Sequence, residues 1–243
     1  FFERTTINAQ VLTDFVTSPD DEGGEAARKL LESTAGRAPL TFAAGWSAHG
    51  VDFLRRLSWK VIAPWPRYVF PKQKSRAQAK QGDHPATGQI NWRELEKQLT
   101  HEEPLFFERS PEVEEYLAST PGHHVVPIEA EGEPTGVARF RKVDGRNGEE
   151  RHLVDFRGIA PHDEPLIQSI REITSTLKTD VYASFLNREL AEKFQQAGAT
   201  PLRPRWVLFC CAGESSAAAI LRSLTSEKNW HLFPADFDLD LEE

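Results

Sequence analysis

Apolar residues recur at helical spacing in two stretches of the chain, residues 47–59 ("SAHGVDFLRRLSW") and 187–199 ("NRELAEKFQQAGA"). In the later stretch four apolar side chains share one helical face: Leu190, Ala191, Phe194 and Ala197. Asn187 can cap the first turn, and Gly198 can end the helix. Both stretches therefore predict short amphipathic helices.

The segments around these two helices also resemble each other. An apolar strand precedes each helix (39–45 and 179–185), and a strand-like segment follows it (59–70 and 199–209). Residues 13–22 resemble residues 154–164, and a helical segment follows each of them, at about 24–34 and 164–177. The chain thus repeats the order strand, loop, helix, strand, helix, strand, which is typical of α/β folds.

The pattern changes between the two repeats. Residues 72–89 are polar and predict a linker, and Asn91–Glu94 has the spacing of a capping box that opens a short helix to about Leu99. Three alternating segments then predict an antiparallel meander: 123–132, 135–145 and 151–159. The first repeat has no such strands before it, and the chain contains no methionine. We therefore expect the chain to begin inside a domain.

Composition narrows the function classes. Of 243 residues, 39% are hydrophobic and 27% charged, which suits a soluble globular protein, and the net charge of -8 disfavours nucleic acids and anionic membranes as partners. No apolar run approaches the roughly 20 residues that span a bilayer. The only two cysteines, Cys210 and Cys211, are adjacent, so we expect no disulfide framework and a cytoplasmic location.

The order meander, strand, loop, helix, strand, helix, strand resembles the GCN5-related N-acetyltransferase (GNAT) fold. In that family the last helix often carries an asparagine, a tyrosine two turns later, and a glycine followed by an aromatic residue one turn further on. The matching residues are Asn187, Phe194, Gly198 and Ala199 in the second repeat, and Ser47, Leu54, Ser58 and Trp59 in the first. The resemblance implies an α/β (α+β) fold with two GNAT-like units in tandem, each a mixed sheet flanked by helices.

The resemblance also implies a place for a cosubstrate. GNAT enzymes hold acyl-CoA at the loop between the central strand and the next helix, whose N-terminal N–H groups receive the pyrophosphate. The family's loop reads Arg/Gln-x-x-Gly-x-Gly/Ala, and Asp21–Ala26 matches it at the glycine and the alanine. We therefore expect acetyl-CoA or another acyl-CoA to bind at Phe15, Val16, Gly23, Gly24, Glu25, Ala26 and Ala27.

Acidic residues weaken this match. Asp21 stands where the family has a cationic or amide residue, and further carboxylates surround it. They oppose a bound pyrophosphate unless Arg28 and Lys29 offset them. The alternative is that Asp21 and Glu22 merely complement the helix dipole.

The second repeat matches less well. Residues 161–165 contain no glycine, and Pro165 donates no N–H, so this stretch is typical of a structural helix start. The tyrosine that many GNAT enzymes use as an acid is replaced by Leu54 and Phe194, which we expect in the core. The catalytic residues are therefore unknown, although positioning of two substrates can itself accelerate a reaction.

Other candidate residues favour structural roles. His123 and His124 lack a second ligand cluster, so we expect no metal site. Asp14 and Asp155 recur in the central strand of each repeat, as a general base in a cleft or, as we favour, as a structural hydrogen-bonding group. Cys210 and Cys211 have no identifiable base beside them and read as buried strand residues. The tail 229–243 alternates acidic and apolar residues and predicts an edge strand or a docking segment, because it lacks the glycine and glutamate of an EF-hand calcium loop.

Four ranges follow from these patterns: a partial GNAT-like domain at 1–71, a linker and short helix at 72–103, a second GNAT-like domain at 104–213, and a helix with an acidic tail at 214–243. The predicted function is acyl-CoA-dependent transfer of an acyl group to an amine of a small molecule or peptide. Two alternatives stay open, an inactive GNAT-like scaffold and an aminoacyl or peptidyl transferase. A homodimer is compatible with the sequence.

Overall fold

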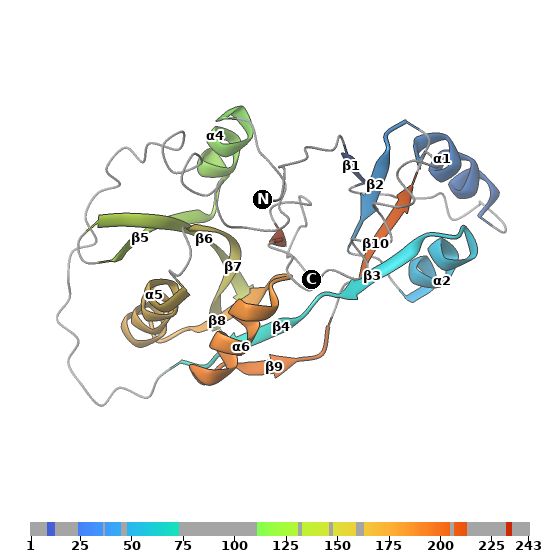
Figure 1. Cartoon of the computed structure of the whole chain (residues 1–243). Helices are drawn as coiled ribbons and strands as arrows, with labels where there is room; N and C mark the ends of the chain where they lie inside the picture. Colours follow the sequence, from blue (N-terminus) through green and yellow to red (C-terminus); the bar gives the residue numbers. More distant parts are fainter. Residues whose placement is uncertain are drawn as a thin grey trace, which may run out of the picture. The chain divides into compact units, whose positions relative to one another are not determined.

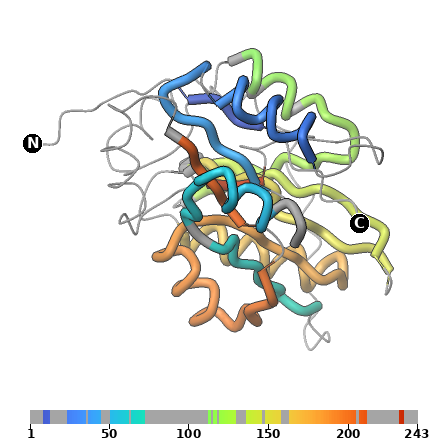
Figure 2. Tube along the Cα trace, turned by 90° about the vertical axis from the view of Figure 1, so that its right-hand side faces the viewer, coloured from blue at the N-terminus to red at the C-terminus, as the bar shows by residue number. Residues whose placement is uncertain are grey.

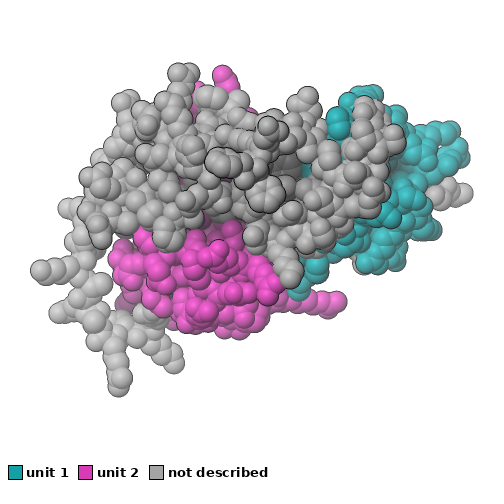
Figure 3. Space-filling view, in the orientation of Figure 1, with its two compact units in different colours: residues 1–65, 204–227, 237–239 teal, residues 66–203, 228–236, 240–243 magenta. Residues whose placement is uncertain are grey.

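The computed structural model describes residues 9–12, 24–35, 37–44, 48–72, 111–130, 133–145, 148–158, 163–204, 207–212 and 232–234. The chain divides into two compact units, coloured separately in Figure 3. Unit 1 comprises residues 1–65, 204–227 and 237–239, and unit 2 comprises residues 66–203, 228–236 and 240–243. Neither unit is one continuous piece of chain.

Unit 1 is built on a mixed four-stranded sheet with the order β1-β2-β10-β3 (Figure 1). The strands β1 (Ala9–Leu12) and β2 (Leu40–Ala43) are parallel, and α1 (Glu25–Ala35) lies between them in sequence. Helix α2 (Ala48–Arg56) leads to β3 (Lys60–Pro64), while β10 (Val207–Ala212) runs antiparallel to both β2 and β3. The buried cluster of this unit is Leu31, Ala35, Ala43, Leu54, Trp59 and Phe209.

Unit 2 is built on a six-stranded sheet with the order β5-β6-β7-β8-β4-β9. Its strands are β5 (His123–Ala130), β6 (Glu133–Gly145), β7 (Gly148–Gly158), β8 (Asp180–Ser184), β4 (Arg67–Phe70) and β9 (Thr200–Leu202), and its helices are α4 (Pro111–Ser119), α5 (Asp163–Thr176) and α6 (Arg188–Gln196). Among the described strands of this sheet, β7 and β8 form the one parallel pair. The predicted meander is therefore confirmed as β5, β6 and β7.

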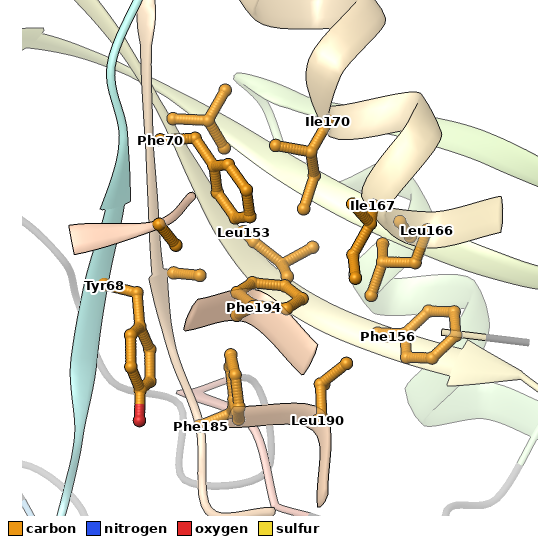
Figure 4. Packing of buried hydrophobic residues seen from close by; sticks show 14 of the residues in the cluster. Tyr68, Phe70, Leu153, Phe156, Leu166, Ile167, Ile170, Phe185, Leu190 and Phe194 are labelled. Carbon is orange, nitrogen blue, oxygen red and sulfur yellow. The ribbon is translucent and has the colours of Figure 1, made fainter. Parts of the chain in front are cut away.

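The core of unit 2 forms where α5 and α6 face the sheet. Leu166, Ile167, Ile170 and Ile173 recur at helical spacing on α5 and are buried. Figure 4 shows Leu166, Ile167 and Ile170 close to Phe194 of α6 and to aromatic residues of the strands. The apolar faces predicted for α5 and α6 are thus buried against the sheet of unit 2.

The last strand of each sequence repeat pairs with strands of the other repeat. Strand β4 follows β3 in sequence but pairs with β8 and β9, and β10 follows β9 but pairs with β2 and β3. In Figure 1 the exchange shows as a cyan strand beside the orange strands β8 and β9, and as an orange-red strand between the blue β2 and the cyan β3. Figure 2 follows the same chain along its Cα trace.

The prediction of one strand-like segment at 59–70 and another at 199–209 is corrected by this exchange. Each is two strands, interrupted at Trp65–Pro66 in the first repeat and at Arg203–Pro204 in the second. Proline has no N–H to continue a strand ladder, so a break is favoured there. The compact units consequently have boundaries that differ from the ranges 1–71 and 104–213.

The two short helices end in the same way. The N–H of Trp59 donates to the carbonyl of Leu54 (3.1 Å), and the N–H of Ala199 donates to that of Phe194 (2.9 Å). Ser58 and Gly198 precede them with φ of 64° and 97°. Both ends therefore have the left-handed cap that glycine favours. Asn187 caps α6 as predicted, since its side chain accepts from the N–H of Leu190 at 2.8 Å.

Several expectations fall outside the described residues. They include the helix at 91–99 and the linker beyond Lys72. In the part of the chain that the structure describes, no helix combines the length and hydropathy needed to cross a membrane.

Candidate functional site

The predicted cosubstrate site lies at the start of α1 in unit 1. Gly24 precedes this helix with φ of 70°, and its carbonyl accepts the N–H of Arg28 at 2.9 Å. A Cβ on Gly24 would lie 3.1 Å from Cε2 of Phe53 on α2. Glycine at position 24 is thus favoured by its positive φ and by the close approach of the Phe53 ring, independently of any ligand.

The side chains of this first turn divide between core and solvent. Ala27 is buried with Leu31 and Ala35 on the inner face of α1. Glu25 is exposed, and its carboxylate lies 2.8 Å from Nζ of Lys29. The start of α1 therefore combines small residues with one exposed carboxylate whose charge is met by a lysine.

The two cations predicted to offset the acidic loop contact carboxylates of α1 itself. Lys29 pairs with Glu25, and Nη1 of Arg28 lies 3.7 Å from the carboxylate of Glu32. All four side chains are at least half exposed. Exposed pairs of this kind contribute little to stability, so either cation can exchange its partner for a phosphate.

Four of the seven predicted cosubstrate residues are described, namely Gly24, Glu25, Ala26 and Ala27, and they are contiguous. Phe15, Val16 and Gly23 lie outside the described residues, as do Asp14, Asp21 and Glu22. The assignment of acyl-CoA to these residues stays a prediction.

The two residues at the position of the family's general-acid tyrosine are buried in the core, as predicted. Leu54 of α2 and Phe194 of α6 are fully buried. The ring centroid of Phe194 lies 5.0 Å from that of Phe70, 5.0 Å from that of Phe185 and 6.2 Å from that of Tyr68. These residues pack the core and carry no proton for a leaving group.

Tyr68 is a residue that sequence reasoning missed. It lies on β4, its ring stacks on Phe185 at 5.4 Å, and its hydroxyl hydrogen-bonds with the Gln195 side chain. Burial raises the pKa of Tyr68. The strand exchange thus places a tyrosine of the first repeat beside α6, and no local pattern signals that.

Asp155 lies in a buried ion-pair network. Nη1 of Arg139, directly opposite on β6, donates to the Asp155 carboxylate, and Nε of Arg157 lies 3.8 Å from it. Asp155 and Arg139 are both fully buried. A buried carboxylate that is paired with buried arginines suits a structural role in the sheet.

The histidines and cysteines contribute no nucleophile or metal cluster within the described ranges. Nδ1 of His123 lies 3.3 Å from the carbonyl oxygen of Leu117, and burial lowers the pKa of this histidine. Burial raises the pKa of Cys210 to about 12, which keeps its thiol protonated, and raises that of Cys211 as well. No three His, Cys, Asp or Glu residues of the described part come together around a metal position.

The parallel strands β7 and β8 stop pairing halfway along β7. Their register runs from Glu150↔Asp180 to Leu153↔Ala183, although β7 continues to Gly158. Val154 is an extra residue on β7, because Leu153 faces Phe140 and Asp155 faces Arg139. Such a bulge bends the strand and separates it from its neighbour.

The tail of the chain lies where this pairing stops. Leu186, just beyond β8, exchanges two backbone hydrogen bonds with Leu232, at 2.9 and 3.1 Å. Phe233 is fully buried, and its ring lies 6.3 Å from Phe156 and 5.6 Å from Phe185. The predicted docking of the tail is therefore observed for Leu232–Pro234, while Asp236, Asp238 and Asp240 lie outside the described residues.

The start of α5 is occupied by its own contacts. Nζ of Lys193 on α6 donates to the carboxylate of Asp163 at 2.7 Å, and this contact raises the pKa of Lys193. Glu164 adds a second carboxylate in the first turn, and Pro165 has no N–H. This helix start is thus less suited to an anion than that of α1.

No protein-family model and no curated protein sequence matches the chain. Solved structures do match its fold. A GCN5-related N-acetyltransferase from Anabaena variabilis matches with a TM-score of 0.56 and 18% identity, over 82% of this chain and 54% of that one.

Two further solved structures give the same result. A protein from Enterococcus faecalis, described as a probable N-acyltransferase, has a TM-score of 0.54 and 16% identity over 83% of this chain and 53% of its own. A GCN5-related N-acetyltransferase from Kribbella flavida has a TM-score of 0.53 and 16% identity over 86% of this chain and 53% of its own. The fold is therefore GNAT-like, and the chain spans about half the length of the solved structures that it matches.

Proposed function

We propose that the chain is an acyl-CoA-dependent N-acyltransferase of tandem GNAT architecture, with its cosubstrate at the start of α1. The observation that carries this proposal is the GNAT-like fold, in which a parallel strand pair, β1 and β2, is connected through a helix that opens at Gly24. A helix N-terminus attracts a pyrophosphate through its backbone N–H groups and its dipole. Small side chains at Gly24 and Ala26 let such a ligand approach the backbone.

The acceptor is proposed to be an amine of a small molecule or peptide. When bound, acyl-CoA supplies the activated acyl group as a thioester. The chain's part is to hold the thioester and the amine in contact, which alone can lower the barrier substantially. Lys29 and Arg28 would shift from Glu25 and Glu32 toward the phosphates.

A scaffold without catalysis is the second candidate, favoured by one observation. Both tyrosine positions of the family motif are buried apolar residues, Leu54 and Phe194. A module of this kind would bind a partner or acyl-CoA without releasing CoA. Release of the CoA thiol in the presence of an amine panel separates the two candidates.

Binding of acetyl-CoA, measured by titration calorimetry, tests the cosubstrate site. Glu25→Gln removes one exposed carboxylate beside the expected pyrophosphate, so we expect binding to tighten about two- to fivefold. The matched control is Glu164→Gln, which removes an exposed carboxylate from the first turn of α5. We expect no change for that variant, and an unmodified chain that binds no acetyl-CoA overturns the enzyme hypothesis.

A further inference from the structure

We propose that Leu232–Pro234 is a built-in strand ligand of unit 2, which closes this unit to acyl-CoA and leaves unit 1 as the single cosubstrate site. The part that concerns unit 1 rests on the function proposed above. The part that concerns unit 2 rests on contacts within that unit alone.

The first step is the register of the β7–β8 pair. Continued beyond Leu153↔Ala183, this register would place Phe156 of β7 opposite Leu186. Instead, Leu186 exchanges both of its backbone hydrogen bonds with Leu232. The tail segment thus takes the place beside Leu186 that β7 leaves when it bends at Val154.

The second step is the side chain that follows. Phe233 lies against Phe156 on the β7 side and against Phe185 on the β8 side, and it is part of the buried core of unit 2. Leu232 and Pro234 are also buried. The segment therefore contacts β7 and the residue that follows β8, beyond the point where the two strands stop pairing, and its side chains are buried in unit 2.

The third step is the chemistry of what is displaced. An extended ligand that carries amide groups can add to a strand edge only through that edge's free N–H and C=O groups. At Leu186 these groups are bonded to Leu232, and the adjoining apolar space is filled by Phe233. At the neighbouring helix start, Asp163 already occupies the Lys193 ammonium group, Glu164 adds a second carboxylate, and Pro165 has no N–H to offer a phosphate. Two separate features of unit 2 thus exclude the same ligand.

Hydrogen exchange together with binding stoichiometry tests this proposal on the full chain. We expect the amides of Leu186 and Leu232 to be protected, one acetyl-CoA to bind per chain, and saturating acetyl-CoA to leave both amides protected. Two acetyl-CoA molecules per chain would overturn the proposal, and so would loss of protection at Leu232 on acetyl-CoA addition. If the chain binds no acetyl-CoA, the proposed function is overturned but the closure of unit 2 is not. Rapid exchange of the Leu186 and Leu232 amides in the chain without ligand would overturn the closure, whatever the binding result.

A substitution adds a second readout. Phe233→Glu places a carboxylate between Phe156 and Phe185, so we expect the segment to leave and exchange at Leu186 to rise at least about tenfold. Leu177→Glu is the matched control, because Leu177 is an exposed apolar residue of the same unit. Unchanged protection of Leu186 in Phe233→Glu would contradict the proposal. If that variant unfolds as a whole, the measurements on the unmodified chain decide.

Discussion

The exchange of strands makes a prediction that runs against the order of the sequence. Phe70 lies on β4 in the first repeat, but it is buried in unit 2, 5.0 Å from the ring of Phe194. Removing a buried phenylalanine ring costs about 3–5 kcal/mol. Because a domain is stable by only about 5–15 kcal/mol, Phe70→Ala should loosen a large part of unit 2.

The matched variant lies on the other exchanged strand. Phe209 of β10 is fully buried in the core of unit 1, so Phe209→Ala should cost a similar amount there. Hydrogen exchange followed by mass spectrometry reads both units in one experiment. We expect Phe70→Ala to accelerate exchange most in β8 and α6, and Phe209→Ala to accelerate it most in β2 and α1. The reasoning is refuted if each variant instead loosens the helices of its own repeat.

Three further predictions concern individual residues. Residues 58 and 198 both have positive φ, which glycine adopts more easily than serine or alanine. Ser58→Gly should therefore raise the free energy of unfolding by about 1 kcal/mol, and Gly198→Ala should lower it by about as much. Urea titrations in which both variants are as stable as the unmodified chain would contradict the shared cap. Asp163→Asn should lower the free energy of unfolding by about 1 kcal/mol near pH 8, because Lys193 loses its partner. The difference in unfolding free energy between this variant and the unmodified chain should shrink as pH rises through the pKa of Lys193, which is raised above 10.5. A difference that stays constant in urea titrations over that range would contradict the pairing. Burial raises the pKa of Cys210 from 9.0 to about 12, so its thiol ionises at lower pH in the unfolded chain than in the folded one. The free energy of unfolding should therefore fall by up to about 1.4 kcal/mol per pH unit across that window. Chemical denaturation should show a shallower fall with pH for Cys210→Ala, and an equally steep fall for both chains would contradict this prediction.

The sequence predicts local elements well because their signals are local. The cap at Asn187, the glycine at 198 and the buried spacing of α5 depend on residues within a few turns of one another. The meander likewise follows from alternation along consecutive strands. These elements lie where the patterns predict them, to within a few residues.

The exchange of β4 and β10 is not predictable from the same signals. Arg67–Phe70 is an alternating strand that fits beside either β2 or β8, since both sheets offer an antiparallel place. The choice between them depends on which core Tyr68 and Phe70 enter, and that is a long-range property. The prolines at 64 and 66 mark the break, but they do not say which sheet the following strand joins.

The candidate site is predicted only in part, for a related reason. The residues Gly24–Ala27 form a helix start as the resemblance implies, yet the roles of Gly24 and Asp155 depend on contacts with Phe53 and Arg139 from other elements. The closure of unit 2 depends on Phe233, nearly fifty residues beyond Leu186 in the chain. A repeat pattern shows which segments are equivalent, but the tail has no counterpart in the first repeat.

A crystal structure of the full chain with acetyl-CoA tests the central claim most directly. We predict density for the pyrophosphate at the first turn of α1, beside Gly24 and Ala26, with Leu232–Pro234 still paired to Leu186. Density for the cosubstrate at the start of α5, with that segment displaced, would contradict the account.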